Sequence, residues 1–385
     1  MARHMTAGRR AGKGRGQARR RPGQGGWRRR RRSLFPPQAS PIEADAPGTS
    51  AFPAQRRARI DGGSWPFSPY EVPGLSAALR THQHGSVARA IDMVDEILAE
   101  HGSEISPIAK IHVLKLLVDW HAEVGNEMEA KRRASRAVRV AMAELGPLHE
   151  ITLVMRNSEL YWMCVCGYED LALNAFAQLL RDIRRAPEVP PGFEFVVRNN
   201  SAMPLKAKGL WERAARVYRD LVADMQGTVD QGDPMYLMTR NNLGEVLAMD
   251  RRFAESTAVY EGLMEDLLES HHCGDERILE LRHLIALNHH EDGNVALARE
   301  QWSILVEDCR RHLGETHSLT GRQRMLQVGL ALDDGDTWRA ARWCRALVDN
   351  PPAGFGPEEI AHFTDLLDIV SGEGPAGEGG DAFGL

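Results

Sequence analysis

From about residue 73 onward, apolar residues recur three and four positions apart along most of the chain. This spacing places them on one face of a helix and predicts a succession of amphipathic helices. The clearest examples are Val87–Leu98, Ile111–Val118, Leu171–Leu180 and Val217–Met225. The pattern therefore predicts an all-α fold.

Two series of residues repeat at a constant interval of 42. The first series is glycine with one exception, at Gly125, Gly167, Gly209, Arg251, Gly293 and Gly335. Five residues later a small side chain stands each time, at Ala130, Ala172, Ala214, Ser256, Ala298 and Ala340. Two independent series with one period indicate a solenoid of about six helix–turn–helix repeats.

Each repeat is predicted to consist of helix A, a tight turn at the glycine, and helix B. Glycine supplies the left-handed backbone conformation that ends helix A at low steric cost, so we expect a differently closed turn at Arg251. The small residue lets the two helices approach, and larger side chains further along helix B fill the space between them. Pro204 lies inside a helix A and should kink or break it.

The repeats divide the chain into three parts. Residues 1–72 are rich in Arg, Gly and Pro and are predicted to be a disordered basic arm. Residues 73–370 are predicted to form the solenoid, with an irregular first hairpin around Gly85 and Ala90 and a capping helix at Pro357–Val370. Residues 371–385 are predicted to be a flexible Gly-rich tail.

Charge divides the chain in the same way. The arm holds 16 Lys and Arg against 4 Asp and Glu, which leaves 32 against 49 for the remainder, or +12 against −17. An Arg-rich arm could bind RNA or DNA phosphates through residues 1–60. It could equally be a solvated tail that meets the acidic solenoid, or result from a start codon assigned too far upstream.

Several classes of function find no support in the sequence. No run of 18 apolar residues occurs, so we expect no membrane span. The arginines at Arg19–Arg21 and Arg28–Arg32 precede Pro, Gly and Ser and not an apolar run of signal-peptide length, so we expect no secretion. The odd number of cysteines, five, fits a reducing, cytoplasmic compartment. No catalytic motif appears, and we expect no enzyme activity and no cofactor.

Histidines gather in one repeat and raise the question of zinc. His271, His272 and Cys273 lie at the end of one helix B, and His283, His289 and His290 lie in the next helix A. Their spacing is not that of a known zinc site. Solvated or groove-facing histidines are the preferred interpretation, and no metal is expected.

The units resemble tetratricopeptide repeats, through Gly-x-x-x-x-Ala across the turn and an aromatic residue four places after the Ala. The 42-residue period resembles the kinesin-light-chain-like variety, as do the segments Leu145–Leu153, Thr239–Leu243 and Leu313–Thr320. The resemblance covers roughly residues 75–370. It implies a right-handed superhelix whose A helices line a concave groove, with peptide or protein binding there and no particular ligand.

Arginine and asparagine also recur at 42-residue intervals on helix A. The candidate groove residues are Arg156, Asn157, Arg198, Asn199, Asn200, Arg240, Asn241 and Asn242. Asn amides could hold a peptide backbone, and Arg could bind carboxylates. Alternatively, Arg could pair between repeats with an aspartate series, Asp182, Asp224, Asp266 and Asp308, which stands 16 residues before the next arginine. We favour ion pairing for Arg and binding for Asn, because the resemblance places Asn on the groove.

These features favour an intracellular peptide- or protein-binding adaptor or regulatory scaffold. The alternative is a nucleic-acid-associated protein whose arm binds RNA or DNA while the solenoid recruits partners.

Overall fold

The computed structural model describes residues 71–372 of the 385-residue chain. Nearly all of the predicted basic arm and of the Gly-rich tail lies outside the described residues. Within 71–372 the regular structure is helical, and the only strand-like feature there is an isolated bridge between Gln226 and Val229.

The helices follow one another with short connections. Their bounds are α4 (Leu75–Gln83), α5 (Val87–Glu100), α6 (Pro107–Glu123), α7 (Glu127–Glu144), α8 (Glu150–Val165), α9 (Glu169–Ile183), α10 (Phe193–Ser201), α11 (Met203–Ala207), α12 (Trp211–Met225), α13 (Pro234–Met249), α14 (Phe253–Leu268), α15 (Glu276–Glu291), α16 (Val295–Leu313), α17 (Ser318–Asp333), α18 (Thr337–Asp349) and α19 (Pro357–Ser371).

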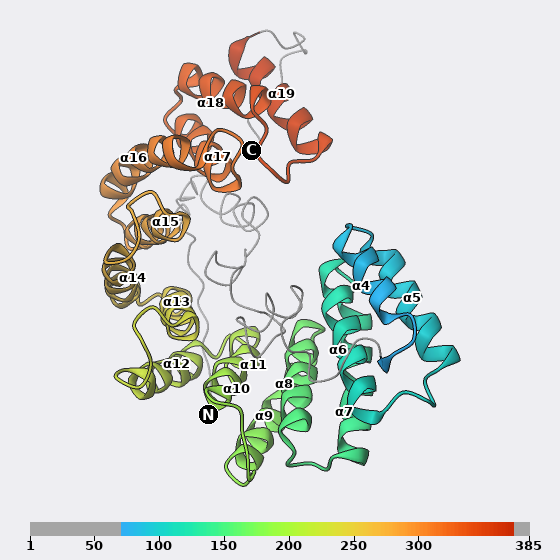
Figure 1. Ribbon diagram of the computed structural model, residues 1–385. Helices are drawn as coiled ribbons and strands as arrows, with labels where there is room; N and C mark the ends of the chain where they lie inside the picture. The colour runs from blue at the N-terminus through green and yellow to red at the C-terminus, as the bar shows by residue number, and fades with distance from the viewer. Residues whose placement is uncertain (1–70, 373–385) are drawn as a thin grey trace, which may run out of the picture. The chain divides into compact units, whose positions relative to one another are not determined.

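Helices adjacent in sequence pack against each other as hairpins, in chain order (Figure 1). The six 42-residue units are α6–α7, α8–α9, α10/α11–α12, α13–α14, α15–α16 and α17–α18. The first helix of each is helix A and the last is helix B. The irregular hairpin α4–α5 precedes them and the capping helix α19 follows. The predicted all-α repeat architecture is confirmed.

The turn between helices A and B is the same in all six units. Each of the five glycines has a φ between 69° and 97°. At Gly125, the turn is closed by N–H bonds from Gly125 to the Ala122 carbonyl (3.0 Å) and from Asn126 to the His121 carbonyl (2.8 Å). These bonds satisfy carbonyls that the helix end leaves free.

Arg251 adopts this turn too, so the expectation of a differently closed turn was wrong. Its φ is 65°, and it is the only non-glycine residue with a positive φ among residues 71–372. Its N–H donates to the Ala248 carbonyl at 3.0 Å, and the next N–H, of Arg252, donates to the Leu247 carbonyl at 2.9 Å. The hairpin and its neighbours impose the conformation on a residue that does not favour it.

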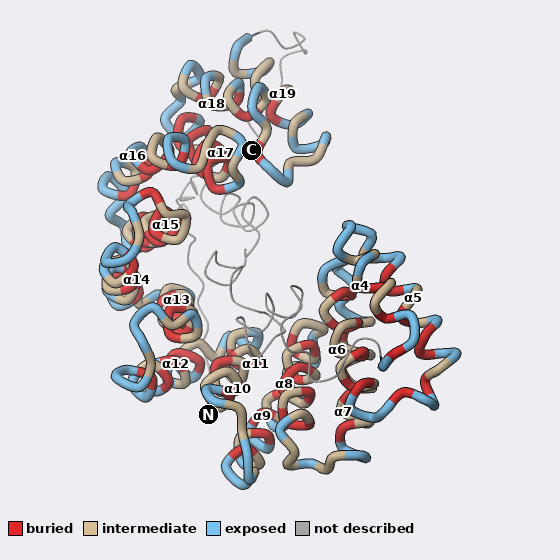
Figure 2. The backbone as a smooth tube through the Cα atoms, in the orientation of Figure 1, coloured by how far each residue is buried: buried red, intermediate tan, exposed pale blue. Residues whose placement is uncertain are grey.

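The repeating small and large positions form the interior. All six small residues, from Ala130 to Ala340, are fully buried, and Figure 2 shows the buried residues running along the inner sides of the hairpins. Interior clusters also join one unit to the next, since Tyr218 of α12 packs with Leu205 of α11 and Val246 of α13. A single hairpin therefore leaves apolar surface that only its neighbours cover.

Pro204 interrupts its helix A, as predicted. Helix A of that unit is divided into α10 and α11, with Ala202 between them and Pro204 in the first turn of α11. Proline has no N–H to donate to the preceding turn, which explains the break. The predicted capping helix is also found, as α19.

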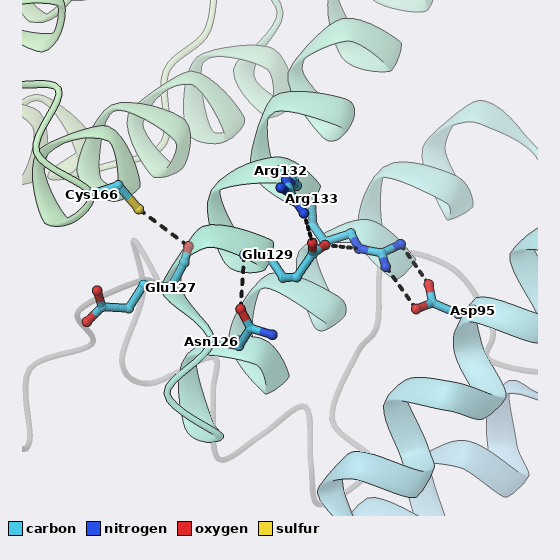
Figure 3. A network of polar contacts seen from close by, with 7 residues as sticks. All are labelled: Asp95, Asn126, Glu127, Glu129, Arg132, Arg133 and Cys166. Carbon is cyan, nitrogen blue, oxygen red and sulfur yellow. Dashed lines mark hydrogen bonds and ion pairs between the residues drawn. The ribbon is translucent and has the colours of Figure 1, made fainter.

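Polar contacts join B helices and turns of successive units (Figure 3). The Arg133 guanidinium of α7 donates two hydrogen bonds, of 2.7 and 2.8 Å, to the Asp95 carboxylate of α5. Glu129, whose N–H is capped by Asn126, lies beside Arg133. The Cys166 thiol of the next turn contacts the Glu127 carbonyl at 3.6 Å. The turn after α8 therefore lies against the start of α7 in the preceding repeat.

Candidate partner-binding face

The A helices of the central repeats contact each other through asparagine side chains. Asn200 Nδ2 donates to Asn157 Oδ1 at 3.2 Å, and Asn242 Nδ2 donates to Asn199 Oδ1 at 3.1 Å. Asn199 Nδ2 lies 3.4 Å from Asn200 Oδ1 and connects the two pairs. These four side chains form one chain of amides, here called the amide chain, which crosses α8, α10 and α13.

The amide chain is mostly buried. Asn157, Asn199 and Asn242 are buried, while Asn200 is half-buried. Asn241 is buried beside the chain without joining it, and the side-chain oxygens of Asn241 and Asn242 accept no hydrogen bond from residues 71–372. A buried amide oxygen without a donor is energetically unfavourable. The structure thus brings the candidate asparagines together and leaves two acceptors unsatisfied.

The arginine series forms ion pairs, but not with the expected aspartates. Arg156 pairs with Asp182 at 2.8 Å and Arg198 with Asp224 at 2.6 Å. Arg240–Asp266 and Arg282–Asp308 repeat the contact. Each aspartate follows its arginine by 26 residues, so the pair joins helix A to the end of helix B within one repeat. The proposed inter-repeat pairing was therefore wrong, although the ion-pair interpretation is confirmed.

The fifth arginine of the series has no aspartate, because Asn350 stands where the next one would be. Arg324 instead forms an ion pair with Glu315 and donates to the Ala346 carbonyl at 3.3 Å. Its burial lowers the pKa of the guanidinium. Arg324 therefore still joins helix A to helix B of its repeat, although the aspartate of the series is missing.

Beyond the amide chain, charged side chains join α15 to α17. The Arg322 guanidinium donates two hydrogen bonds, of 2.9 and 3.0 Å, to the Glu280 carboxylate. Beside this pair His283 Nδ1 lies 3.1 Å from Gln323 Nε2. Burial, together with the Arg322 charge, lowers the pKa of His283.

Sequence reasoning missed this cluster although its signal was present. His283 stands 42 residues after Asn241 and therefore continues the asparagine series, while Arg322 stands 42 residues after Glu280. Because His283 was considered as one of a group of histidines, its place in the asparagine series was not recognised.

The other histidines and the cysteines show no arrangement for metal binding. Within residues 71–372, no three His, Cys, Asp or Glu side chains converge in a way that could hold a metal ion. All five cysteines are free thiols. Burial raises the pKa of Cys164 and Cys309 to about 12 and that of Cys344 to about 11, so these thiols are unreactive.

Helices that could cross a membrane are absent from the described part of the chain. None there combines sufficient length with sufficient apolar character.

No protein-family model and no curated protein matches the sequence. Solved structures do match. A tetratricopeptide repeat protein from Parabacteroides merdae has a TM-score of 0.51 at 12% identity, covering 79% of this chain and 100% of its own. The chain has the tetratricopeptide-repeat fold. At this identity the likeness establishes the fold alone.

Two further structures have related repeats. A signal-transduction ATPase with numerous domains from Pyrococcus horikoshii, which carries a tetratricopeptide repeat sensor, has a TM-score of 0.51 at 13% identity, covering 78% of this chain and 44% of its own. A kinesin light chain from Podosopora anserina with nearly identical tetratricopeptide-like repeats has a TM-score of 0.47 at 14% identity, covering 52% of this chain and 96% of its own.

Proposed function

We propose that this tetratricopeptide-repeat protein is a binding protein that takes an extended peptide or protein segment on the face formed by its A helices. The observation that carries the proposal is the amide chain across α8, α10 and α13, whose half-buried member Asn200 keeps part of its amide accessible on the A helices. The fold supports it, since the Pyrococcus horikoshii protein uses repeats of this fold as a sensor.

The chemistry of this face suits a peptide backbone. An asparagine side chain both donates and accepts, as a backbone amide does, so it can replace the hydrogen bonds that an extended peptide makes to water. Asn200 is the half-buried member of the amide chain, so its amide is the one that a bound peptide can reach. Half-buried apolar side chains of the same helices, Val154, Val196 and Met238, repeat at 42 residues and offer contacts for apolar peptide side chains.

The arginine series has a supporting role in this proposal. Arg156, Arg198 and Arg240 are held by carboxylates of their own hairpins and fix the position of each helix A relative to its helix B. We therefore assign ligand contacts to the asparagines and not to the arginines.

The test is selection of binders from a displayed random-peptide library on the full chain, followed by affinity measurement for the selected peptides. Asn200→Ala should weaken binding about tenfold, because it removes a hydrogen bond between uncharged groups and leaves the group that it bonded without a partner. The matched control is Asn174→Ala, because Asn174 is exposed on the helix B α9. Peptides that bind both variants as tightly as the unmodified protein would contradict the proposal.

A further inference from the structure

The last repeat carries an open pocket between its helix B and the capping helix. The pocket has a volume of about 420 Å³. It is lined from α18 and α19 by Thr337, Trp338, Ala341, Arg342, Arg345, Val370 and Ser371. None of these residues belongs to the A-helix face described above, so the pocket is a separate feature.

In two earlier repeats the equivalent junction is closed by a charge pair. The third residue after the turn glycine is Asp170 in α9, which pairs with Lys208 of the following repeat. In α12 the same position is Glu212, which pairs with Arg252 of the next turn at 2.5 Å. In α18 this position is Trp338. An exposed aromatic ring therefore stands where two other repeats have a paired carboxylate.

Apolar surface is unusually exposed here. Trp338 is 72% exposed and Ile369, next to the pocket residue Val370, is 67% exposed, the two highest values among large apolar side chains of the described chain. Clustered exposed apolar side chains mark interaction surfaces more often than single ones do. Tryptophan and arginine are also the side chains that most often anchor protein interfaces.

The pocket's two arginines are available to an anion, while the Arg342 guanidinium also lies over the Trp343 ring, 5.2 Å from its centroid. Arg342 and Arg345 are exposed and lie one helical turn apart on α18, and no carboxylate of residues 71–372 forms an ion pair with either. Their neighbour Arg339, by contrast, lies 4.0 Å from carboxylates of Asp334 and Asp336. Two unpaired guanidinium groups beside an indole favour a ligand that combines carboxylates with a large apolar side chain.

We propose that this pocket binds an acidic peptide segment of a partner protein, whose carboxylates meet Arg342 and Arg345 and whose aromatic or aliphatic side chain lies on Trp338. A peptide is favoured over a nucleic acid because Asp333, Asp334 and Asp336 lie two to five residues before Trp338. A phosphate at every nucleotide would be repelled by these carboxylates, whereas a peptide can place its charges selectively.

The experiment titrates the full chain into a fluorescein-labelled peptide, Gly-Glu-Asp-Glu-Leu-Phe-Asp-Glu-Gly, and follows fluorescence anisotropy. Saturable binding is expected, weakened by added salt because it depends on charge. Trp338→Ala and Arg345→Glu should each reduce affinity about tenfold or more, and both residues are exposed, so circular dichroism should show unchanged helix content. Peptides with Lys for the acidic residues, or Ser for Leu and Phe, should bind at least tenfold more weakly.

Matched variants separate this site from the others. Arg311→Glu changes an exposed arginine on α16 and should leave binding unchanged, as should Asn200→Ala on the A-helix face. Absence of saturable binding, or equal affinity of Trp338→Ala and unmodified protein, overturns the proposal. It is also overturned if a single-stranded oligonucleotide competes with the same residue dependence, or if the protein self-associates through Arg345, which would identify a second copy as the occupant.

Discussion

At the scale of single residues, Arg251 holds a backbone conformation that costs an L side chain about 1 kcal/mol. Because its φ of 65° matches that of the five turn glycines, Arg251→Gly should relieve this strain without altering the turn. We predict that the free energy of unfolding rises by about 1 kcal/mol. Glycine also increases the conformational entropy of the unfolded chain, which offsets part of this gain. Thermal and urea denaturation followed by circular dichroism would measure it.

The reverse substitution is the control. Gly167 has a φ of 83°, and a methyl group added there would meet no atom within 4 Å, so Gly167→Ala introduces backbone strain alone. It should lower the free energy of unfolding by about 1 kcal/mol. If Arg251→Gly also lowered stability, the contact of its guanidinium with the Phe253 ring, at 5.6 Å, would outweigh the strain.

His283 should make stability sensitive to acid. Burial and the Arg322 charge lower its pKa in the folded protein, whereas in the unfolded chain it stays near the ordinary value of about 6.5. Below that pH the unfolded state binds the extra proton, so stability present above about pH 6.5 is lost as the pH falls. His283→Asn, which restores the residue of its series, should therefore lose less stability than the unmodified protein between about pH 7.5 and pH 5.5.

The control is His362→Asn, at an exposed position of α19. Between about pH 7.5 and pH 5.5 this variant should lose as much stability as the unmodified protein. Identical losses in His283→Asn and unmodified protein would show that His283 does not carry the effect.

At the scale of the helices, the small residue after each turn sets how closely a hairpin can pack. Ala298 on α16 is fully buried, so Ala298→Leu must displace its neighbours and should cost about 1–3 kcal/mol. Ala258→Leu, at an exposed position of α14, should change stability by less than about 0.5 kcal/mol. Equal effects in the two variants would show that the position does not limit packing.

The sequence was most informative about these elements and least informative about polar partners. The turn positions, the small residues, the break at Pro204 and the helix α19 follow from backbone chemistry and periodicity, which are local. The partner of Arg198 could not be predicted, because two aspartates of one series, Asp182 and Asp224, stand before and after it and only the packing of the helices selects between them. The conformation of Arg251 escaped prediction because the surrounding repeats, not the residue, determine it.

At the scale of the whole described chain, stability should vary along the repeats. The unit with the divided helix A, α10 and α11, lacks a continuous hydrogen-bonded helix. We predict that amide hydrogens of residues 193–207 exchange faster than those of α13 and α15, as measured by hydrogen–deuterium exchange and mass spectrometry. Pro204→Ala should slow exchange in this segment. An unchanged exchange rate would show that Pro204 is not the cause of its lower stability.

The polar contacts between successive repeats span similar lengths of chain. Arg133 and Asp95 are 38 residues apart, Arg322 and Glu280 are 42 apart, and Asn200 and Asn157 are 43 apart. A nascent chain therefore needs only one further hairpin to leave the ribosome before the previous one finds all its partners. Folding can keep pace with translation, from the first hairpin to the last, without waiting for any distant segment.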